Sequence, residues 1–314
     1  MQISDLKVTV LAGGVGGAKL VLGFNRLSEP GNLSVIVNTG DDFRHFGLQI
    51  CPDLDSVSYA LAGLANKTYG WGQENETWHV ADALKDLGAP TWFQLGDRDL
   101  ATHLERSRLL DHGKTLAEAT TILSERFGIK SKVSPMCNQP APTLIETKQG
   151  SLLTFQDYLV RLAAEPEVAR IILSGEGKLS LLPEAIHALE EADIVVFAPS
   201  NPWVSIDPIL SLKGAREAVE KKPVYAVSPI IQGKALKGPA ARMFEDLGIK
   251  PTCQAVMEHY RGLLDVFVYD SSDEPIEDAD IETVQFQTIM KDDQDKMQLA
   301  QQIAEHFLHT RGSV

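Results

Sequence analysis

The segment Val8–Lys19 constrains the fold of this chain more than any other stretch. An apolar, β-favouring run leads into four glycines at positions 13, 14, 16 and 17, and Lys19 and a helical pattern follow. Glycine admits positive φ angles and lets a ligand approach the backbone closely. A turn of this kind, leading into a helix N-terminus, presents unpaired N–H groups and the positive end of the helix dipole to an anion. We therefore predict a phosphate-binding loop at the end of a first strand, with a purely structural tight turn as the alternative.

The spacing of these glycines does not identify the ligand. A Walker loop carries Ser or Thr directly after its lysine, whereas Leu20 follows Lys19 here. The dinucleotide fingerprint needs glycines at its first, third and sixth positions, and neither Gly13–Ala18 nor Gly14–Lys19 matches it in full. The loop thus indicates a phosphate group without choosing between NAD and ATP.

The net charge narrows the range of partners. The chain has 314 residues and a formal charge of -14, which opposes binding to nucleic acid or to an anionic membrane. A divalent cation between carboxylates and phosphates is the usual way for an acidic protein to bind a phosphate. No apolar run reaches the roughly 18 to 20 residues that span a bilayer. The three scattered cysteines form no metal-type spacing, so we expect reduced thiols and a cytoplasmic protein.

Strand-like and helix-like segments alternate along the chain, which is typical of an α/β fold with a mainly parallel sheet and helices on both faces. The predicted strands are Lys7–Leu11, Leu33–Val37, Thr91–Leu95, Arg170–Leu173, Ile194–Ala198, Val224–Val227 and Asp265–Tyr269. Residues 110–165 contain two β-runs about Lys148–Gly150 and are predicted to form a smaller inserted α+β subdomain. Residues 1–109 and 166–314 then form a Rossmann-like core, which ends in an amphipathic helix over Asp292–His309.

Aspartates gather in two segments next to predicted elements. Asp41 and Asp42 follow the second strand, where ligands bind in open α/β sheets. Their carboxylates suit Mg²⁺ coordination, and a solvated turn is the alternative. Asp53 and Asp55 stand at the start of a helical run. Asp55 can cap that helix, bind a ligand, or do both.

The segment Gly96–His103, GDRDLATH, follows another predicted strand. Asp99 can cap the next helix, and Arg98 can pair with a phosphate or a carboxylate. His103 falls one turn into that helix, and we interpret this lone histidine as structural rather than as a ligand.

Polar and aromatic side chains also occur near other strand ends. Ser200 and Asn201 follow one predicted strand, and Ser228 follows the next. Trp71 and Trp78 flank a polar segment, where they either stack on a flat heterocycle or pack in the core. The chain carries no G-x-S-x-G elbow and no HExxH motif. This favours a reaction driven by positioning and electrostatics, as phosphoryl transfer is.

Taken together, these segments resemble the 2-phospho-L-lactate transferases, which build the deazaflavin coenzyme, factor 420. The resemblance rests on AGGVGGAK, NTGDD, CPDLDS, YGWGQENETW, LGDRDLATHL, APSNPWVSI and VSPIIQGKALKGPA, in the family's order and spacing from about Lys7 to Tyr269. It implies a Rossmann-like fold with a smaller insertion and a Mg²⁺-dependent transferase. The implied donor is a guanosine-diphosphate-activated three-carbon acid. The implied acceptor is the ribityl hydroxyl of the deazaflavin Fo, and GMP is the leaving group.

The resemblance also implies roles for individual residues. The nucleotide is expected at Gly13, Gly14, Gly16, Gly17, Lys19, Ser200, Asn201 and Ser228. Fo is expected at Asp55, Asp97, Arg98 and Thr102, and Mg²⁺ at Asp41, Asp42 and Asp55. The expected catalytic carboxylates are Asp55 and Asp42, and which aspartate acts as the base stays open.

Some features leave the substrate open. The loop Gly14–Lys19 is similar to that of bacterial members, which favours phosphoenolpyruvate over phospholactate or phosphoglycerate. Gln94 stands where some archaeal members have a lysine that touches Fo, and Ser56 replaces the more usual threonine. The alternatives are a nucleotide-sugar-binding regulatory protein of the related family and an NAD-dependent oxidoreductase. Asn38 at the tip of the second strand counts against the oxidoreductase. A homodimer is compatible with the sequence, which is silent on oligomeric state.

Overall fold

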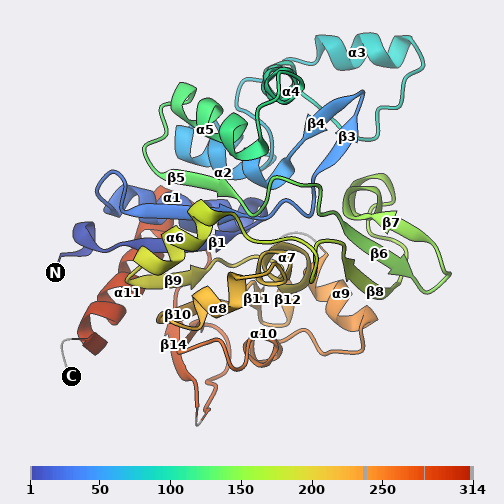
Figure 1. Ribbon diagram of the computed structural model, residues 1–314. Helices are drawn as coiled ribbons and strands as arrows, with labels where there is room; N and C mark the ends of the chain where they lie inside the picture. The colour runs from blue at the N-terminus through green and yellow to red at the C-terminus, as the bar shows by residue number, and fades with distance from the viewer. Residues whose placement is uncertain (1, 236–238, 279, 312–314) are drawn as a thin grey trace.

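A seven-stranded sheet lies at the centre of the part of the chain that the structure describes (Figure 1). This structure is a computed structural model, and it describes residues 2–235, 239–278 and 280–311. All neighbouring strands of the sheet are parallel, in the order β14-β13-β10-β9-β1-β2-β5. Their bounds are β1 (Val8–Ala12), β2 (Leu33–Val37), β5 (Lys132–Pro135), β9 (Ile194–Phe197), β10 (Val224–Val227), β13 (Val266–Asp270) and β14 (Glu282–Phe286). The predicted parallel α/β fold is confirmed.

Successive residues of the central strands point into two different hydrophobic cores. In β9, Ile194 and Val196 belong to one core, whereas Val195 and Phe197 belong to the other. Since side chains alternate across a strand, both faces of the sheet are buried, and this explains the continuous apolar strand sequences. One face is covered by α1 (Gly14–Leu27), α2 (Pro52–Ala62) and α11 (Asp293–Arg311). The other face is covered by α6 (Pro183–Glu191), α8 (Ala215–Val219) and α10 (Cys253–His259).

The order of the strands reverses direction at β1. The chain first adds β2 on one side of β1 and later adds β9 on the other side. Ligands of open α/β sheets bind outside the C-terminal ends of the strands at such a switch point. Gly13 and the first turn of α1 follow the end of β1 at this place, and the Pro199–Asn201 loop follows the end of β9. The topology therefore positions the glycine-rich loop where a ligand site is expected.

Within the described residues, a second sheet of three antiparallel strands lies beside the main sheet (Figure 1). It contains β6 (Thr143–Thr147), β7 (Leu152–Thr154) and β8 (Val168–Leu173). The first two form the predicted hairpin about Lys148–Gly150, and β8 pairs with the other side of β6. Strand β5 falls inside the range predicted for the insertion, but it pairs with β2 at the edge of the main sheet.

The predicted strand over Thr91–Leu95 is wrong, because these residues belong to none of the four sheets of the described chain, and Trp92 and Phe93 form a bend. Trp92 and Phe93 instead pack their rings against Phe43, with ring centroids 5.8 and 4.9 Å apart. Phe43 belongs to a hairpin of β3 (Phe43–His45) and β4 (Leu48–Ile50). Aromatic packing against this hairpin therefore replaces the expected strand pairing.

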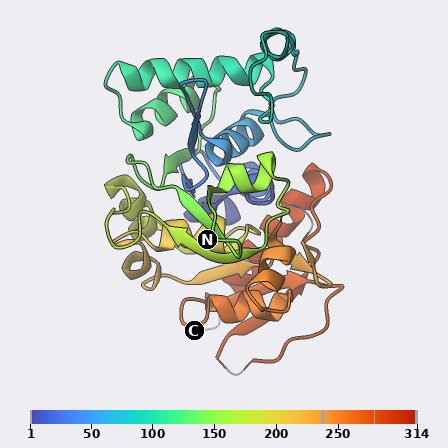
Figure 2. The same cartoon turned by 90° about the vertical axis from the view of Figure 1, so that its right-hand side faces the viewer.

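The remaining elements complete the layers around the main sheet. They are α3 (His79–Asp86), α4 (Asp97–Asp111), α5 (Leu116–Arg126), α7 (Asp207–Leu210) and α9 (Ala240–Asp246), the strand pair β11 (Ile230–Ile231) and β12 (Lys234–Ala235), and short helical turns over Ile3–Asp5, Asp157–Arg161 and Pro202–Ile206. In Figure 2, α4 lies above α2, on the side away from the sheet. Among the described helices, none is both long and apolar enough to cross a membrane.

The predicted C-terminal helix is confirmed as α11, which packs along α1. The two helices approach closely at Gly23, a buried residue of α1. A Cβ atom added at Gly23 would overlap the carbonyl oxygen of Lys296 and crowd the Cβ of Ala300. The absence of a side chain at Gly23 therefore allows the two backbones to meet.

Replacing Gly23 with alanine tests this packing. Helix propensity alone favours alanine by about 1 kcal/mol, but the overlap with the Lys296 backbone forces the helices apart. We expect Gly23→Ala to lower the free energy of unfolding by about 1–3 kcal/mol in urea denaturation. Arg26→Ala, at an exposed position of the same helix, is the control and should change it by less than about 0.5 kcal/mol. A Gly23→Ala protein as stable as the unchanged protein would contradict the close approach.

Candidate active site

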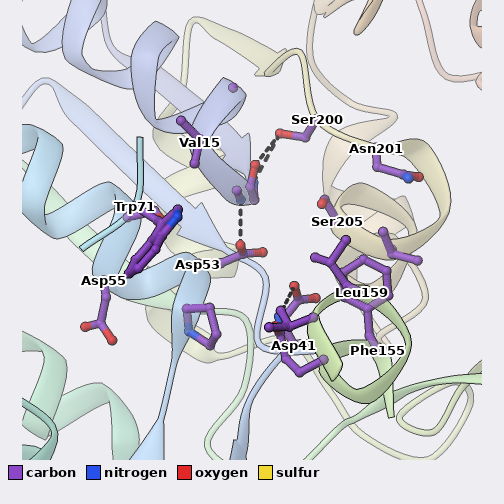
Figure 3. Close-up of a pocket in the computed structure, with 18 of the residues that line it drawn as sticks. Val15, Asp41, Asp53, Asp55, Trp71, Phe155, Leu159, Ser200, Asn201 and Ser205 are labelled. Atoms are coloured by element: carbon purple, nitrogen blue, oxygen red, sulfur yellow. Dashed lines mark hydrogen bonds between the residues drawn. The ribbon is translucent and has the colours of Figure 1, made fainter. Parts of the chain in front are cut away.

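A cleft of about 620 Å³ opens where the C-terminal ends of β1, β2, β9 and β10 meet (Figure 3). Nine of the predicted site residues line it: Gly13, Gly14, Gly16, Lys19, Asp41, Asp55, Ser200, Asn201 and Ser228. Asp53 lies near the middle of the close-up, with Trp71 on one side and Phe155 and Leu159 on the other. Four polar strand ends and two apolar walls therefore surround one cavity.

Three glycines of the glycine-rich segment, Gly13, Gly16 and Gly17, lie against their neighbours with no room for a Cβ atom. Gly14, the first residue of α1, has a φ of +63°, which favours glycine. A Cβ atom added at Gly16 would lie 2.6 Å from the carbonyl oxygen of Pro199. The Gly13 N–H donates to Ser200 Oγ at 3.2 Å, and the Ser200 hydroxyl donates back to the Gly13 carbonyl at 2.7 Å. The loop thus leads the first amides of α1 into the cleft, an arrangement suited to an anion.

Asp53, from the first turn of α2, contacts this loop directly. Its Oδ1 accepts a hydrogen bond from the Gly14 N–H at 2.6 Å, and its Oδ2 accepts one from Asn38 Nδ2 at 2.8 Å. Asn38 Nδ2 also lies 3.0 Å from Asp41 Oδ1. The other oxygen of Asp41 accepts from Gln156 Nε2 at 3.2 Å. Asp41 and Asp53 are therefore two buried carboxylates held side by side by one shared amide.

Burial disfavours the charged form of both carboxyl groups. It raises the pKa of Asp53 to about 6, and the amides of Asn38 and Gly14 oppose this shift only in part. It also raises the pKa of Asp41 well above its ordinary value, and the neighbouring Asp53 adds to that effect. Such a pair fits a divalent cation, because hard cations bind carboxylate oxygens and would supply the missing positive charge. Asp41 and Asp53 thus form the pair of carboxylates in the cleft that could hold a divalent cation.

Asp55 points away from Asp53 into different surroundings (Figure 3). Residues two apart on a helix are rotated by about 200° about its axis, so these two side chains leave α2 on different sides. Arg106 of α4 donates from both terminal nitrogens to the Asp55 carboxylate, and the Nη1 to Oδ2 distance is 3.1 Å. Both side chains are buried. The Arg106 guanidinium therefore balances the charge of Asp55. The hydrogen bonds of Asp41 and Asp53 come from amides instead.

Asp99 and His103 complete a buried polar cluster around Asp55. Tyr59 donates its hydroxyl to Asp99 Oδ1 at 2.6 Å, and His103 Nε2 lies 3.3 Å from the same oxygen. The ligand atoms of Asp55, Asp99 and His103 lie within 4.8 Å of one another, as in a metal site. Arg106 counts against a metal there, because its positive charge is already in the cluster and its Nη1 contacts His103 Nδ1 at 3.1 Å. We interpret this cluster as an ion pair with its supporting hydrogen bonds.

Three residues expected to contact Fo lie outside the lining of the cleft: Asp97, Arg98 and Thr102. Asp97 instead caps α3, where its carboxylate accepts hydrogen bonds from the amides of His79 and Val80 at 3.2 and 3.1 Å. The helical period of α4 brings Asp99 and His103 to the cleft. His103, interpreted as structural from the sequence, is buried at the edge of the cleft and contacts Arg106.

Gly17 and Asp42 also lie outside the lining. A Cβ atom added at Gly17 would lie 2.7 Å from Ser200 Oγ, so this glycine is required by packing beneath the loop. Asp42 lies beside Cys51, and burial raises the pKa of its carboxyl well above the ordinary value. Residues 236–238 of the VSPIIQGKALKGPA motif lie outside the described residues.

Sequence reasoning assigns no role to Asp53, although this residue contacts the glycine-rich loop. The spacing of Asp53 and Asp55 carries the missing information, because two residues at positions i and i+2 of a helix do not share a face. No pattern in the sequence predicts that Phe155 forms an apolar wall of the cleft. It comes from the small sheet region, which no short pattern links to the loop.

The buried pair of Asp55 and Arg106 should contribute strongly to stability. Arg106→Met leaves the Asp55 carboxylate buried without its cation, and we expect a loss of about 3–5 kcal/mol in the free energy of unfolding. Adding Asp55→Asn should recover part of that loss, because it removes the unpaired charge. Arg108→Met, at an exposed position of the same helix, is the matched control in urea denaturation. A loss below about 1 kcal/mol for Arg106→Met would show that the pair is loose, as exposed ion pairs are.

The raised pKa of Asp53 predicts a pH dependence in protein freed of divalent cations by a chelator. The folded protein holds a proton on Asp53 more tightly than the unfolded chain does. The associated stability is therefore present below about pH 4 and is lost as the pH rises through about 6. Asp53→Asn should thus improve the free energy of unfolding by about 1–2 kcal/mol more at pH 7.5 than at pH 5. Asp86→Asn, at an exposed position, should show no such difference. An equal effect of Asp53→Asn at both pH values would count against the shift.

Known proteins resemble this chain over most of its length. The family described as 2-phospho-L-lactate transferase CofD matches residues 8–308. A 2-phospho-L-lactate transferase of Methanosarcina mazei is 39% identical over 264 residues, which cover 84% of this chain and 87% of that protein. A phosphoenolpyruvate transferase of Streptomyces coelicolor is 38% identical over 275 residues, which cover 85% and 86%. A solved structure of a UPF0052 family protein of Bacillus halodurans has the same fold, with a TM-score of 0.62 and 18% identity over 95% of this chain and 99% of that one. The chain therefore belongs to the 2-phospho-L-lactate transferase CofD family.

Proposed function

We propose that this protein transfers a phosphorylated three-carbon acid from its guanosine-diphosphate-activated form to the ribityl hydroxyl of the deazaflavin Fo and releases GMP. The observation that carries the proposal is the combination, in one cleft, of a helix N-terminus, two buried carboxylates and aromatic walls. The acid is 2-phospho-L-lactate or phosphoenolpyruvate, the two acids in the names of the relatives.

The first turn of α1 is the proposed site of the diphosphate. Its amides and dipole attract anions, and the side chains of Ser200, Asn201 and Ser228 line the same region. Lys19 lines the cleft too, where its Nζ donates to the carbonyl of Met290 at 2.6 Å. When bound at Asp41 and Asp53, Mg²⁺ would offset the negative charge of the diphosphate.

The aromatic side of the cleft is the proposed site of the deazaflavin ring. Trp71 is 40% exposed although it is a large apolar side chain, and it stacks on Tyr69 with ring centroids 5.6 Å apart. Trp92 and Phe93 line the same cleft. Exposed aromatic faces of this kind favour a flat heterocycle. Asp99 and His103 offer hydrogen-bonding partners for its polar edge.

Asp55 lines the same cleft and suits the acceptor hydroxyl. Held by Arg106, its carboxylate can accept a hydrogen bond from that hydroxyl and orient it. The hydroxyl oxygen forms a bond to the phosphorus that carries the acid, the phosphorus–oxygen bond to GMP breaks, and the hydroxyl proton passes to a carboxylate or to water. The chain thus contributes orientation and electrostatics and forms no covalent intermediate.

Binding of Fo, followed by quenching of its own fluorescence, tests the acceptor site. We expect saturable binding, and Trp71→Ala should weaken it by about tenfold because a stacking surface is lost. Phe46→Ala removes an exposed aromatic ring outside the cleft lining and should leave the affinity unchanged. Release of GMP from a synthetic guanosine-diphosphate-activated acid, only when Fo is present, would establish the transfer. Absence of Fo binding together with binding of a UDP-sugar would favour a regulatory protein instead.

A further inference from the structure

The place proposed for a phosphate oxygen already holds a carboxylate oxygen. Asp53 Oδ1 lies 2.6 Å from the amide nitrogen of Gly14, the first residue of α1 (Figure 3). Asp53 is only 4% exposed and lines the cleft, so it forms part of the cleft wall. A Cβ atom added at Gly13 would lie 2.7 Å from Asp53 Oδ2, which shows how closely the carboxylate lies against the loop.

A phosphate cannot use this amide while Asp53 does. The N–H of Gly14 has one hydrogen, and a second anion placed beside it would face the negative charge of Asp53 at short range in a poorly solvated region. In the absence of a nucleotide, the Gly14 amide is therefore already bonded to the Asp53 carboxylate.

The second oxygen of Asp53, Oδ2, lies next to Asp41. It shares the Asn38 amide with Asp41, at 2.8 Å for Asp53 Oδ2 and 3.0 Å for Asp41 Oδ1. A cation that binds both carboxylates would thus draw Asp53 toward Asp41. If Asp53 gave both of its oxygens to that cation, Oδ1 would have to leave the Gly14 amide.

We propose that Asp53 is a built-in competitor for the nucleotide's phosphate, and that a divalent cation shared with Asp41 removes it from the Gly14 amide. This inference rests on the proposed function, because it assumes a nucleotide at the glycine-rich loop. It makes binding ordered: the cation precedes or accompanies the nucleotide, and a nucleotide without a cation meets an occupied site. Asp53 is then a residue that couples the two ligands.

The test is GDP binding by calorimetry, in excess Mg²⁺ and in a chelator, for the unchanged protein and for Asp53→Ala. We expect Mg²⁺ to tighten GDP binding to the unchanged protein by more than about tenfold. In the chelator, Asp53→Ala should bind GDP about tenfold more tightly than the unchanged protein, because the amide is free. Asp53→Asn keeps a neutral oxygen at that place, so it should show a smaller gain and serves as a second, more conservative variant.

Asp41→Ala is the matched control, since it removes the other buried carboxylate of the pair without touching Gly14. Its gain in the chelator should stay below about threefold, which separates competition for the amide from general relief of negative charge. Equal gains for Asp41→Ala and Asp53→Ala, or no gain for either Asp53 variant, would overturn the inference while leaving the nucleotide site in place. Failure of the unchanged protein to bind GDP even with Mg²⁺ would overturn the proposed function itself, and the inference with it.

Discussion

The close approach of the glycine-rich loop to both of its neighbours is the constraint on which the site depends. Gly16 lies against the carbonyl of Pro199 on one side, and Gly13 lies against Asp53 on the other. A side chain at either position would push α2 or the segment after β9 away from the end of β1. Because the sheet is buried on both faces, its strands cannot shift to make room. The glycines thus bring the N-terminus of α1 and the acidic first turn of α2 into contact.

Two carboxylates of one helical turn therefore serve different purposes. Asp53 faces the loop and shares an amide with Asp41, whereas Asp55 faces α4 and is paired with Arg106. The first environment lacks positive charge and suits a cation, and the second is already balanced and suits orientation of a hydroxyl. The two aspartates differ in surroundings only because the helical period directs their side chains to different sides of α2. It also separates the proposed metal ligands from the residue proposed to orient the acceptor.

Much of this molecule can be predicted from local patterns. The parallel sheet, the hairpin at Lys148–Gly150 and the C-terminal helix all follow from apolar periodicity and turn residues. The strand at Thr91–Leu95 cannot be excluded in this way, because a short apolar run does not reveal that its aromatic rings pack on a distant hairpin. The partner of Asp55 is equally hidden, since Arg106 reaches it only after α4 has packed across α2. The sequence alone shows which residues of one helix share a face. Which residues of two different helices form a pair can be known only from the folded structure.

The most direct test of the account is a crystal structure of the protein with GDP and Mn²⁺, which binds carboxylate oxygens and is located by its anomalous scattering. We expect one Mn²⁺ ion between Asp41 and Asp53, with a phosphate oxygen accepting the hydrogen bond from Gly14. A Mn²⁺ ion at Asp55, Asp99 and His103, or a bound GDP with Asp53 still on the Gly14 amide, would contradict it.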